Sequence, residues 1–274
     1  MRVFCLSLLV LLISTSLSVA QKQVRLTLSE FRDKYPIDSS DIYRDKYTLQ
    51  PANVKVNIIT PVRKTGGIER SFKLKKGLVV GQYKEFYWND ALKMKGKYKK
   101  GKKVGNWKEL YVEGSVKSTV KYKAGMLQGI KKTFYKSGNI DEIGEYKDNQ
   151  MTGEWKGLYD NGSVKYTETY LDGNLIGISM HYYPNGQTRE QAECSNGMYN
   201  GRWEDFYENG NKKGEGDYKN GTEDGKWIWY YENGNKKSEA FYRNGKFDGN
   251  MIFYNTDGSV SKKATYIDGV KQNP

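Results

Sequence analysis

The sequence predicts an all-β fold, an elongated twisted β-meander or solenoid of about eight 24-residue two-strand repeats in one curled antiparallel sheet. The first observation is a glycine that recurs every 24 residues without one insertion, at Gly81, Gly105, Gly129, Gly153, Gly177, Gly201, Gly225 and Gly249. The second is a glycine nine residues later in seven of the eight copies. The third is a pair of Asn-Gly or Asp-Gly turn signals in most copies, such as Asn233-Gly234 and Asn244-Gly245. Because such pairs suit the positive φ angles of hairpin turns, each copy is expected to form two strands joined by tight turns.

The register of the repeat follows if both turns have two-residue loops. In the repeat from Gly225 this predicts the pairs Gly225–Tyr242, Trp227–Ala240, Tyr231–Lys236 and, across the second turn, Tyr242–Phe247. One face then collects glycine, tryptophan, tyrosine and a small residue, which interlock without clash. Glu168 is the one misfit at the small position.

An apolar stripe is expected on the opposite, otherwise charged face. Its members are Phe86, Leu110, Phe134, Leu158, Tyr182, Phe206, Tyr230 and Tyr254. The same register places Lys93 opposite Phe86, and Lys237 opposite Tyr230. Lysine stems that cover the rings explain this arrangement structurally. The alternative is a ligand-binding stripe, for which Phe86, Phe134, Tyr182, Phe206 and Tyr230 are the candidate residues.

The N-terminus has the features of a secretory signal peptide over residues 1–20. Arg2 precedes an apolar run, and Ser18-Val19-Ala20 forms a small-x-small cleavage site, so Gln21 is the expected mature start. The run is short for a membrane span, which needs about 20 apolar residues; an uncleaved anchor is the alternative. We therefore expect an exported protein in the periplasm, at the cell surface or secreted, without a transmembrane segment in the mature chain.

The remaining chain divides into a leader and a repeat array. Residues 21–65 are expected to form a leader and N-terminal cap, residues 66–80 a degenerate half-repeat, 81–269 the eight repeats, and 270–274 a polar tail. Within the leader, Leu26–Tyr35 can form a short helix ended by Pro36, and Val54–Ile59 alternates weakly as a strand. The leader and the tail would protect the two edges of the sheet.

Positive charge is concentrated in the first half of the chain. Residues 21–129 contain 25 Lys/Arg against 10 Asp/Glu, a net charge of +15, whereas residues 130–274 carry −3. The densest segment contains Lys93, Lys95, Lys97, Lys99, Lys100, Lys102, Lys103 and Lys108 without one acidic residue. A solvated strand edge is the simple interpretation. A contact surface for an anionic partner is the functional one, and it makes Lys93 to Lys103 candidate binding residues.

Catalytic, metal and cofactor chemistry is not expected. His181 is the only histidine, and Cys194 is the only cysteine after the signal peptide. The register places His181 opposite Glu190 and puts Cys194 in a position that tyrosine holds in the other repeats, so both residues are interpreted as structural. The carboxylates form no repeated pair, and no helix follows the glycines as a phosphate-binding loop requires.

The repeat resembles the bacterial variant of the MORN repeat. The resemblance rests on the segment from Gly225 to Lys237, Gly-Lys-Trp-Ile-Trp-Tyr-Tyr-Glu-Asn-Gly-Asn-Lys-Lys, followed by Tyr242 and Gly245, and it covers residues 66–269. Many bacterial members of this family are described as antitoxins, so the resemblance implies binding and neutralisation of a toxin. Eukaryotic MORN repeats are associated with membranes, scaffolding and phosphoinositides.

These observations predict a non-enzymatic, exported repeat protein that binds or scaffolds a protein partner, with an antitoxin-like or immunity-like role as one form. The alternative is a binder of an anionic or glycan surface, such as a membrane lipid or a cell-wall polymer, through the basic segment and the aromatic stripe. Nucleic acid is not an expected partner. The glycine-tryptophan-tyrosine hairpins also resemble choline-binding repeats, although the period of 24 fits those poorly. An unrecognised hydrolase is the third possibility.

Overall fold

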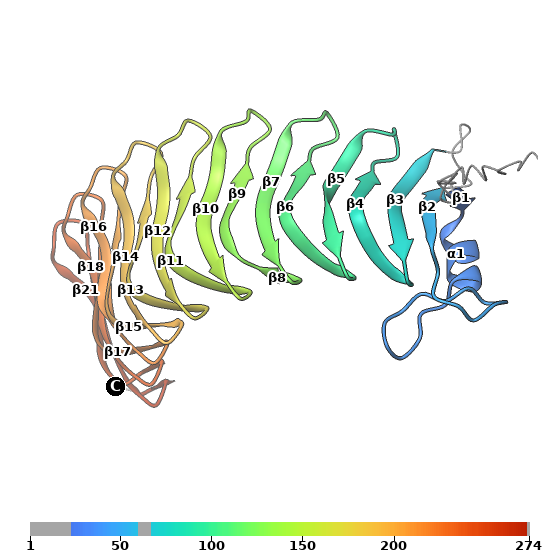
Figure 1. Ribbon diagram of the computed structural model, residues 1–274. Helices are drawn as coiled ribbons and strands as arrows, with labels where there is room; N and C mark the ends of the chain where they lie inside the picture. Colours follow the sequence, from blue (N-terminus) through green and yellow to red (C-terminus); the bar gives the residue numbers. More distant parts are fainter. Residues whose placement is uncertain (1–22, 60–66, 273–274) are drawn as a thin grey trace, which may run out of the picture.

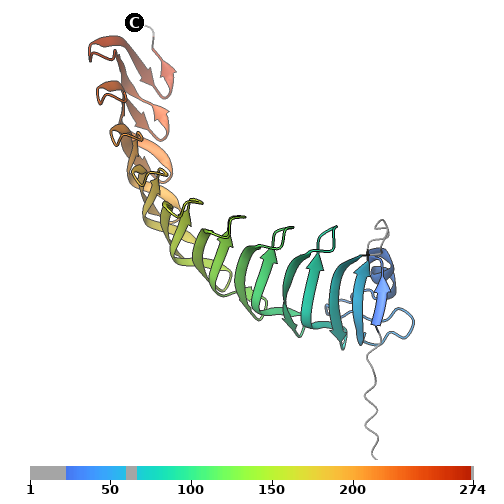
Figure 2. The same cartoon turned by 90° about the horizontal axis from the view of Figure 1, so that it is seen from above.

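The computed structural model describes residues 23–59 and 67–272 as one continuous sheet of 22 strands, which turns through a wide bend along its length (Figures 1 and 2). β1 pairs with β2 in parallel, and the later strands pair antiparallel with their neighbours in chain order. The strands of the N-terminal region and first repeats are β1 (Gln23–Leu26), β2 (Val54–Ile59), β3 (Ile68–Lys75), β4 (Leu78–Phe86), β5 (Leu92–Lys99), β6 (Lys102–Leu110), β7 (Val116–Lys123), β8 (Met126–Leu127), β9 (Gly129–Phe134), β10 (Ile140–Lys147) and β11 (Gln150–Leu158). The later ones are β12 (Val164–Leu171), β13 (Asn174–Tyr182), β14 (Thr188–Ser195), β15 (Met198–Phe206), β16 (Lys212–Lys219), β17 (Thr222–Tyr230), β18 (Lys236–Arg243), β19 (Lys246–Phe247), β20 (Gly249–Tyr254), β21 (Val260–Ile267) and β22 (Val270–Lys271). The all-β meander that the repeat predicts is confirmed, while the expected signal peptide lies outside the described residues.

The second turn of each repeat is the predicted two-residue hairpin. Asp172 and Gly173 both have positive φ, 49° and 83°, and the flanking residues Leu171 and Asn174 pair directly. Positive φ at both central positions is the mark of a type I′ turn, whose twist matches that of the strands. The predicted pair Tyr242–Phe247 across the equivalent turn is confirmed.

The first turn of each repeat is longer than predicted. In the repeat from Gly225, the amide of Gly234 donates to the carbonyl of Tyr231, and the amide of Tyr231 donates to the carbonyl of Asn235. This is a three-residue loop that ends in a glycine with positive φ, followed by an extra residue in the strand. Tyr230 therefore pairs with Lys236, and the predicted pair Tyr231–Lys236 is wrong.

Tryptophans interlock with small residues on one side of the sheet, here called the tryptophan face. Trp227 is 3% exposed and pairs with Ala240, as predicted. A Cβ atom added to Gly216, on the preceding strand, would collide with the Trp227 indole. Trp107 and Trp155 are buried in the same way against Gly96 and Gly144. Because no second layer of the described residues covers these rings, their burial depends on the absence of side chains at the facing glycines.

Each repeat begins with a bulge. Gly225 has φ of 74°, and the pairing shifts by two residues between Glu215–Ile228 and Asp217–Asp224. Extra residues on one strand bend it and increase its twist. The predicted pair Gly225–Tyr242 is confirmed.

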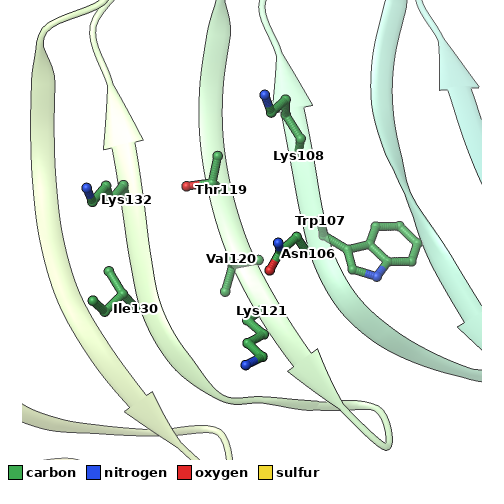
Figure 3. A pocket seen from close by; sticks show the side chains of 8 residues that line it. All are labelled: Asn106, Trp107, Lys108, Thr119, Val120, Lys121, Ile130 and Lys132. Atoms are coloured by element: carbon green, nitrogen blue, oxygen red, sulfur yellow. The ribbon is translucent and has the colours of Figure 1, made fainter.

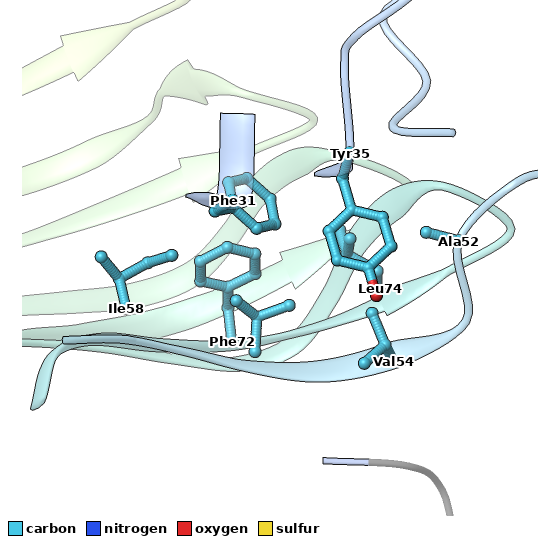
Figure 4. Close-up of a cluster of buried hydrophobic side chains, with 8 residues drawn as sticks. Phe31, Tyr35, Ala52, Val54, Ile58, Phe72 and Leu74 are labelled. Atoms are coloured by element: carbon cyan, nitrogen blue, oxygen red, sulfur yellow. The ribbon is translucent and has the colours of Figure 1, made fainter. Parts of the chain in front are cut away.

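The N-terminal region packs a conventional core against the first strands. α1 (Leu28–Lys34) begins at a capping box formed by Thr27 and Glu30, and its Phe31 is buried. Figure 4 shows Phe31 lying over Phe72; their rings meet edge to face at 5.6 Å. The other members of this cluster are Tyr35, Ala52, Val54, Val56, Ile58 and Leu74. The short helix and the strand expected in the leader are thus present as α1 and β2.

Candidate binding face

The side of the sheet opposite the tryptophans carries a row of lysines over β4, β5 and β6. Lys84 pairs directly with Lys95, and Lys95 pairs directly with Lys108. The row continues to hydroxyl side chains at both ends, because Ser71 pairs with Lys84 and Thr119 pairs with Lys108. The name lysine face is used here for the exposed or half-buried side chains Lys55, Lys73, Lys84, Lys95, Lys97, Lys99, Lys108, Lys121 and Lys132.

Among the described residues, the lysine face has no counter-ions. Within residues 23–59 and 67–272, none of its nine lysines takes part in an ion pair. Like charges directly opposite each other on neighbouring strands destabilise a sheet. The repulsion is about 1 kcal/mol for a pair at 4 Å in water and falls with added salt. The row Lys84–Lys95–Lys108 is therefore unfavourable for the free protein.

The same side of the sheet is neutralised in the C-terminal repeats. Glu204 and Glu215 also pair directly, but Lys212 lies 2.8 and 2.7 Å from their carboxylates. Arg202 contacts both carboxylates as well. Lys226 and Lys236 in turn lie 2.9 and 3.2 Å from Glu239. These carboxylates of the C-terminal repeats therefore have cationic partners, whereas the lysine face has no anionic ones among the described residues.

A shallow hollow of about 360 Å³ lies on the lysine face between β6, β7 and β9 (Figure 3). Its lysines are Lys108, Lys121 and Lys132, and the Thr119 hydroxyl stands among them in the figure. Asn106 adds an amide, and Ile130 adds an apolar side chain that is 57% exposed. Ammonium, amide and hydroxyl donors around one hollow suit an oxyanion.

A second hollow of about 400 Å³ lies between β2, β3 and β4. It also gathers three lysines and a hydroxyl side chain, Lys55, Lys73, Lys84 and Ser71. Gln82 supplies the amide. The lysine face therefore has two sites of similar donor chemistry.

Two of the predicted binding lysines lie on the tryptophan face instead. Lys93 lies 2.9 Å from the Glu85 carboxylate, and this hydrogen bond raises the pKa of Lys93. Lys103 lies over the Trp107 ring, 4.3 Å from its centroid, and burial lowers the pKa of Lys103. The physical reason for Lys93 is the extra strand residue beside the first turn. Lys103 pairs with Tyr98 across the second turn and therefore shares its face. Lys93 already has a carboxylate partner and Lys103 lies over an aromatic ring, so neither belongs to the lysine face, and their role as binding residues stays a prediction.

The other predicted lysines are placed as the alternation requires. Lys95, Lys97 and Lys99 are exposed on β5. Lys100 and Lys102 are exposed at the turn between β5 and β6, where Lys99 pairs with Lys102. These five residues belong to or border the lysine face.

The predicted aromatic stripe is half-buried at the strand ends. Half-buried side chains are found at all five candidate positions, Phe86, Phe134, Tyr182, Phe206 and Tyr230. The predicted lysine partners are wrong, because the extra strand residue pairs Phe86 with Leu92 rather than with Lys93. Lys237 does cover a ring, at 5.9 Å from the centroid, but the ring is that of Tyr231, the residue after the predicted partner Tyr230.

His181 and Cys194 both lie on the tryptophan face. His181 pairs with Glu190 as predicted, and its ring nitrogens lie 3.2 Å from Arg189 and 3.5 Å from Glu168. Cys194 is buried, and its thiol faces the carbonyl of Ala192 at 3.7 Å. No cluster of metal-ligating side chains occurs in the described residues. None of the helices there is long and apolar enough to cross a membrane.

Sequence reasoning placed Lys108 in the basic segment but missed Lys84, Lys121 and Lys132 as members of the same surface. The signal was present in the repeat, because Lys84, Lys108 and Lys132 are spaced 24 residues apart. A linear run of lysines draws attention to Lys99–Lys103 instead. The contiguous surface crosses the strands and is seen only once the pairing is known.

Several of the repeats match a known sequence family. The family model described as "MORN repeat variant" matches residues 127–148, 151–172, 199–220 and 223–244. No curated protein matches the sequence. Among solved structures, the crystal structure of TcdB2-TccC3 is 12% identical with a TM-score of 0.19, the match covering 86% of this chain and 15% of that one. That of TcdB2-TccC3-Cdc42 is 13% identical with a TM-score of 0.14, covering 78% and 16%. This chain thus spans about a sixth of their length. The four sequence matches identify repeats of the MORN repeat variant family within residues 127–244 of this chain.

Proposed function

We propose that this chain is a non-enzymatic, exported binding protein that holds an acidic protein partner on its lysine face. The observation that carries the proposal is Lys95, which lies directly between Lys84 and Lys108 without a counter-ion among the described residues. A partner with negative charge would relieve this repulsion on binding. It would also associate faster at low salt, because complementary charge steers the encounter.

A protein partner is favoured by the mixture of groups in the hollows. The exposed Ile130 stands beside Thr119, Asn106 and three lysines in the hollow of Figure 3. Protein interfaces combine apolar contacts with hydrogen bonds in this way, and elongated repeat proteins present long surfaces for such contacts. An immunity-like role, in which the chain holds a toxin outside the cytoplasm, is the form of this function that the family suggests.

The test is a capture experiment with the mature chain and native envelope fractions at low and moderate salt. The parent is compared with a variant in which Lys95, Lys97, Lys99 and Lys102 are replaced by glutamate. A control variant makes the same change at Lys219, Lys246, Lys262 and Lys263, which are exposed in the C-terminal repeats.

We expect the parent and the control to retain a protein that moderate salt releases, and the lysine-face variant to lose it. Equal capture by all three chains, or capture without salt dependence, would contradict the proposal. Enrichment of glycan or lipid in place of protein would overturn the choice of partner and favour an anionic envelope polymer or membrane surface.

Export is tested separately by sequencing the N-terminus of the protein isolated from its native source. The expected sequence begins at Gln21 or within a few residues of it. A soluble cytoplasmic protein with intact Met1 would contradict export.

A further inference from the structure

The two hollows of the lysine face are related by the repeat. A shift of 48 residues, two repeats, moves Ser71 to Thr119, Lys73 to Lys121, and Lys84 to Lys132. Hydroxyl and lysine thus occupy equivalent places in both hollows. The equivalent places in the intervening repeat hold Lys95, Lys97 and Lys108, so positive charge continues from one hollow to the other.

The distance between the hollows follows from the strand spacing. Ser71 lies on β3 and Thr119 on β7, and these strands are four steps apart in the sheet. At about 4.8 Å a step, equivalent points in the two hollows are separated by about 19 Å. The line that joins them crosses the strands and follows the long axis of the sheet.

The geometry points to an extended acidic segment of the partner that lies along this axis, with one carboxylate in each hollow. An extended chain advances about 3.3 Å per residue, so about six residues span the distance. Residues six apart point to the same side of an extended chain, because its side chains alternate. The carboxylates at every second position between them would face Lys95 and Lys108.

A helical segment would fit this surface with a different spacing. A helix rises about 1.5 Å per residue, so about thirteen residues would be needed to reach from one hollow to the other. The two forms of partner therefore differ in the acidic pattern that they require, and short peptides can separate them.

This inference rests on the proposed function, and the experiment separates the two. Three synthetic peptides of equal length carry four glutamates each among neutral residues. The first places them at every second position, the second places them consecutively, and the third places them along one face of an alanine-rich helix. Binding to the mature chain is measured by fluorescence anisotropy at low salt.

We expect the alternating peptide to bind about tenfold more tightly than the consecutive one, because it engages both hollows at once. The double variants Lys73→Gln/Lys84→Gln and Lys121→Gln/Lys132→Gln should each abolish this preference. The control Lys262→Gln/Lys263→Gln, at exposed positions of β21, should keep it.

Each outcome decides one point. Equal affinity for the alternating and consecutive peptides, or tightest binding of the helical one, would overturn the extended segment and leave the lysine face as a docking surface. Binding of all peptides that is unaffected by both lysine double variants would overturn the docking surface as well.

Discussion

The hydroxyl of Tyr159 donates a hydrogen bond of 2.7 Å to the backbone carbonyl of Tyr182, on the neighbouring hairpin. Equivalent bonds run from Tyr87, Tyr111, Tyr135, Tyr183, Tyr207 and Tyr231 to the carbonyl 23 residues further on. The donor tyrosine recurs at the same position of seven repeats. It joins each hairpin to the next through side chain and backbone, in addition to the strand pairing.

Replacing Tyr159 with phenylalanine should lower the free energy of unfolding by about 0.5–1.5 kcal/mol, the typical net contribution of one hydrogen bond. Because the ring is retained, the loss of stability reports only the missing hydroxyl and the part-buried carbonyl of Tyr182 that is left without this donor. Denaturant unfolding of the variant measures it. Tyr47→Phe is the control, since Tyr47 is 79% exposed. An equal loss of unfolding free energy in both variants would contradict a stabilising role for these tyrosine hydrogen bonds.

Two kinds of glycine should respond differently to substitution. Gly225 has φ of 74°, and a Cβ atom there would meet nothing within 4 Å, so its requirement is conformational and not contact with Tyr242. Asparagine tolerates this region of φ better than other residues with a side chain. Gly216 faces the Trp227 indole instead. Overpacking of a close contact typically costs about 1–3 kcal/mol.

We therefore expect Gly216→Asn to lower the melting temperature strongly and Gly225→Asn to lower it little. Gly225→Val should be worse than Gly225→Asn, because a β-branched residue is strained at positive φ. If valine and asparagine at Gly225 were equivalent, the conformational explanation would be wrong.

The repeat from Gly177 should open first. Ser179 stands where four other repeats have tryptophan, at Trp107, Trp155, Trp203 and Trp227, and Cys194 stands in the tyrosine position. In the described residues, the contacts between tryptophan and tyrosine rings along the tryptophan face are interrupted twice, between Tyr122 and Tyr146 and between Tyr170 and Tyr199. In the second gap, β13 contributes only the His181 ring, which lies 5.7 Å from the Tyr166 ring. Local opening follows weak packing. Amides of β13 and β14 should exchange with deuterium earlier than those of β15 and β16, and equal exchange would argue against a weak point.

Acid should weaken the C-terminal repeats through Glu239. Its hydrogen bond with Lys226, helped by Tyr254 and Lys236, lowers the pKa of Glu239 from 4.5 to about 2. A carboxyl with a depressed pKa in the folded state stabilises the fold above its usual pKa, and this contribution disappears as the pH falls through the folded-state value. The stabilising contribution of Glu239 is therefore lost as the pH falls from about 4.5 to about 2.

The measurement is the melting temperature of the parent and of Glu239→Gln across this window. The variant should be less stable than the parent near neutral pH, and the difference should shrink toward pH 2. Glu232→Gln, at an exposed turn position, is the control and should show no such convergence. A constant difference at every pH would rule out titration of Glu239 as its cause.

The repeat fold was predictable because one local pattern is copied eight times. Trp227–Ala240 and Tyr242–Phe247 follow from alternation and from turns that Asn-Gly pairs mark. What the pattern could not distinguish was a two-residue turn from a three-residue turn with a bulge, since both use Asn-Gly. That single extra residue moves Lys93 from the predicted face to the side of Glu85.

The candidate site was predictable only in part for a related reason. Lys95, Lys97 and Lys99 share a face because side chains alternate along one strand. Lys84 and Lys108 join them through pairing across strands, and the bulge at Gly105 shifts this pairing by two residues. The absence of counter-ions depends on where distant carboxylates lie, which no local pattern contains.

The central claim is that Lys95 is unfavourable for the free fold and useful for binding. The most direct measurement is the melting temperature of the parent and of Lys95→Glu at low salt, with and without poly-glutamate as an acidic probe. Without the probe, Lys95→Glu should melt higher, because glutamate would pair with Lys84 and Lys108 where lysine is repelled. With the probe, the parent should be stabilised by mass action more than the variant, so the difference between the two melting temperatures should shrink or change sign. A variant that melts lower than the parent without the probe, or an equal shift in both chains on adding it, would contradict the account.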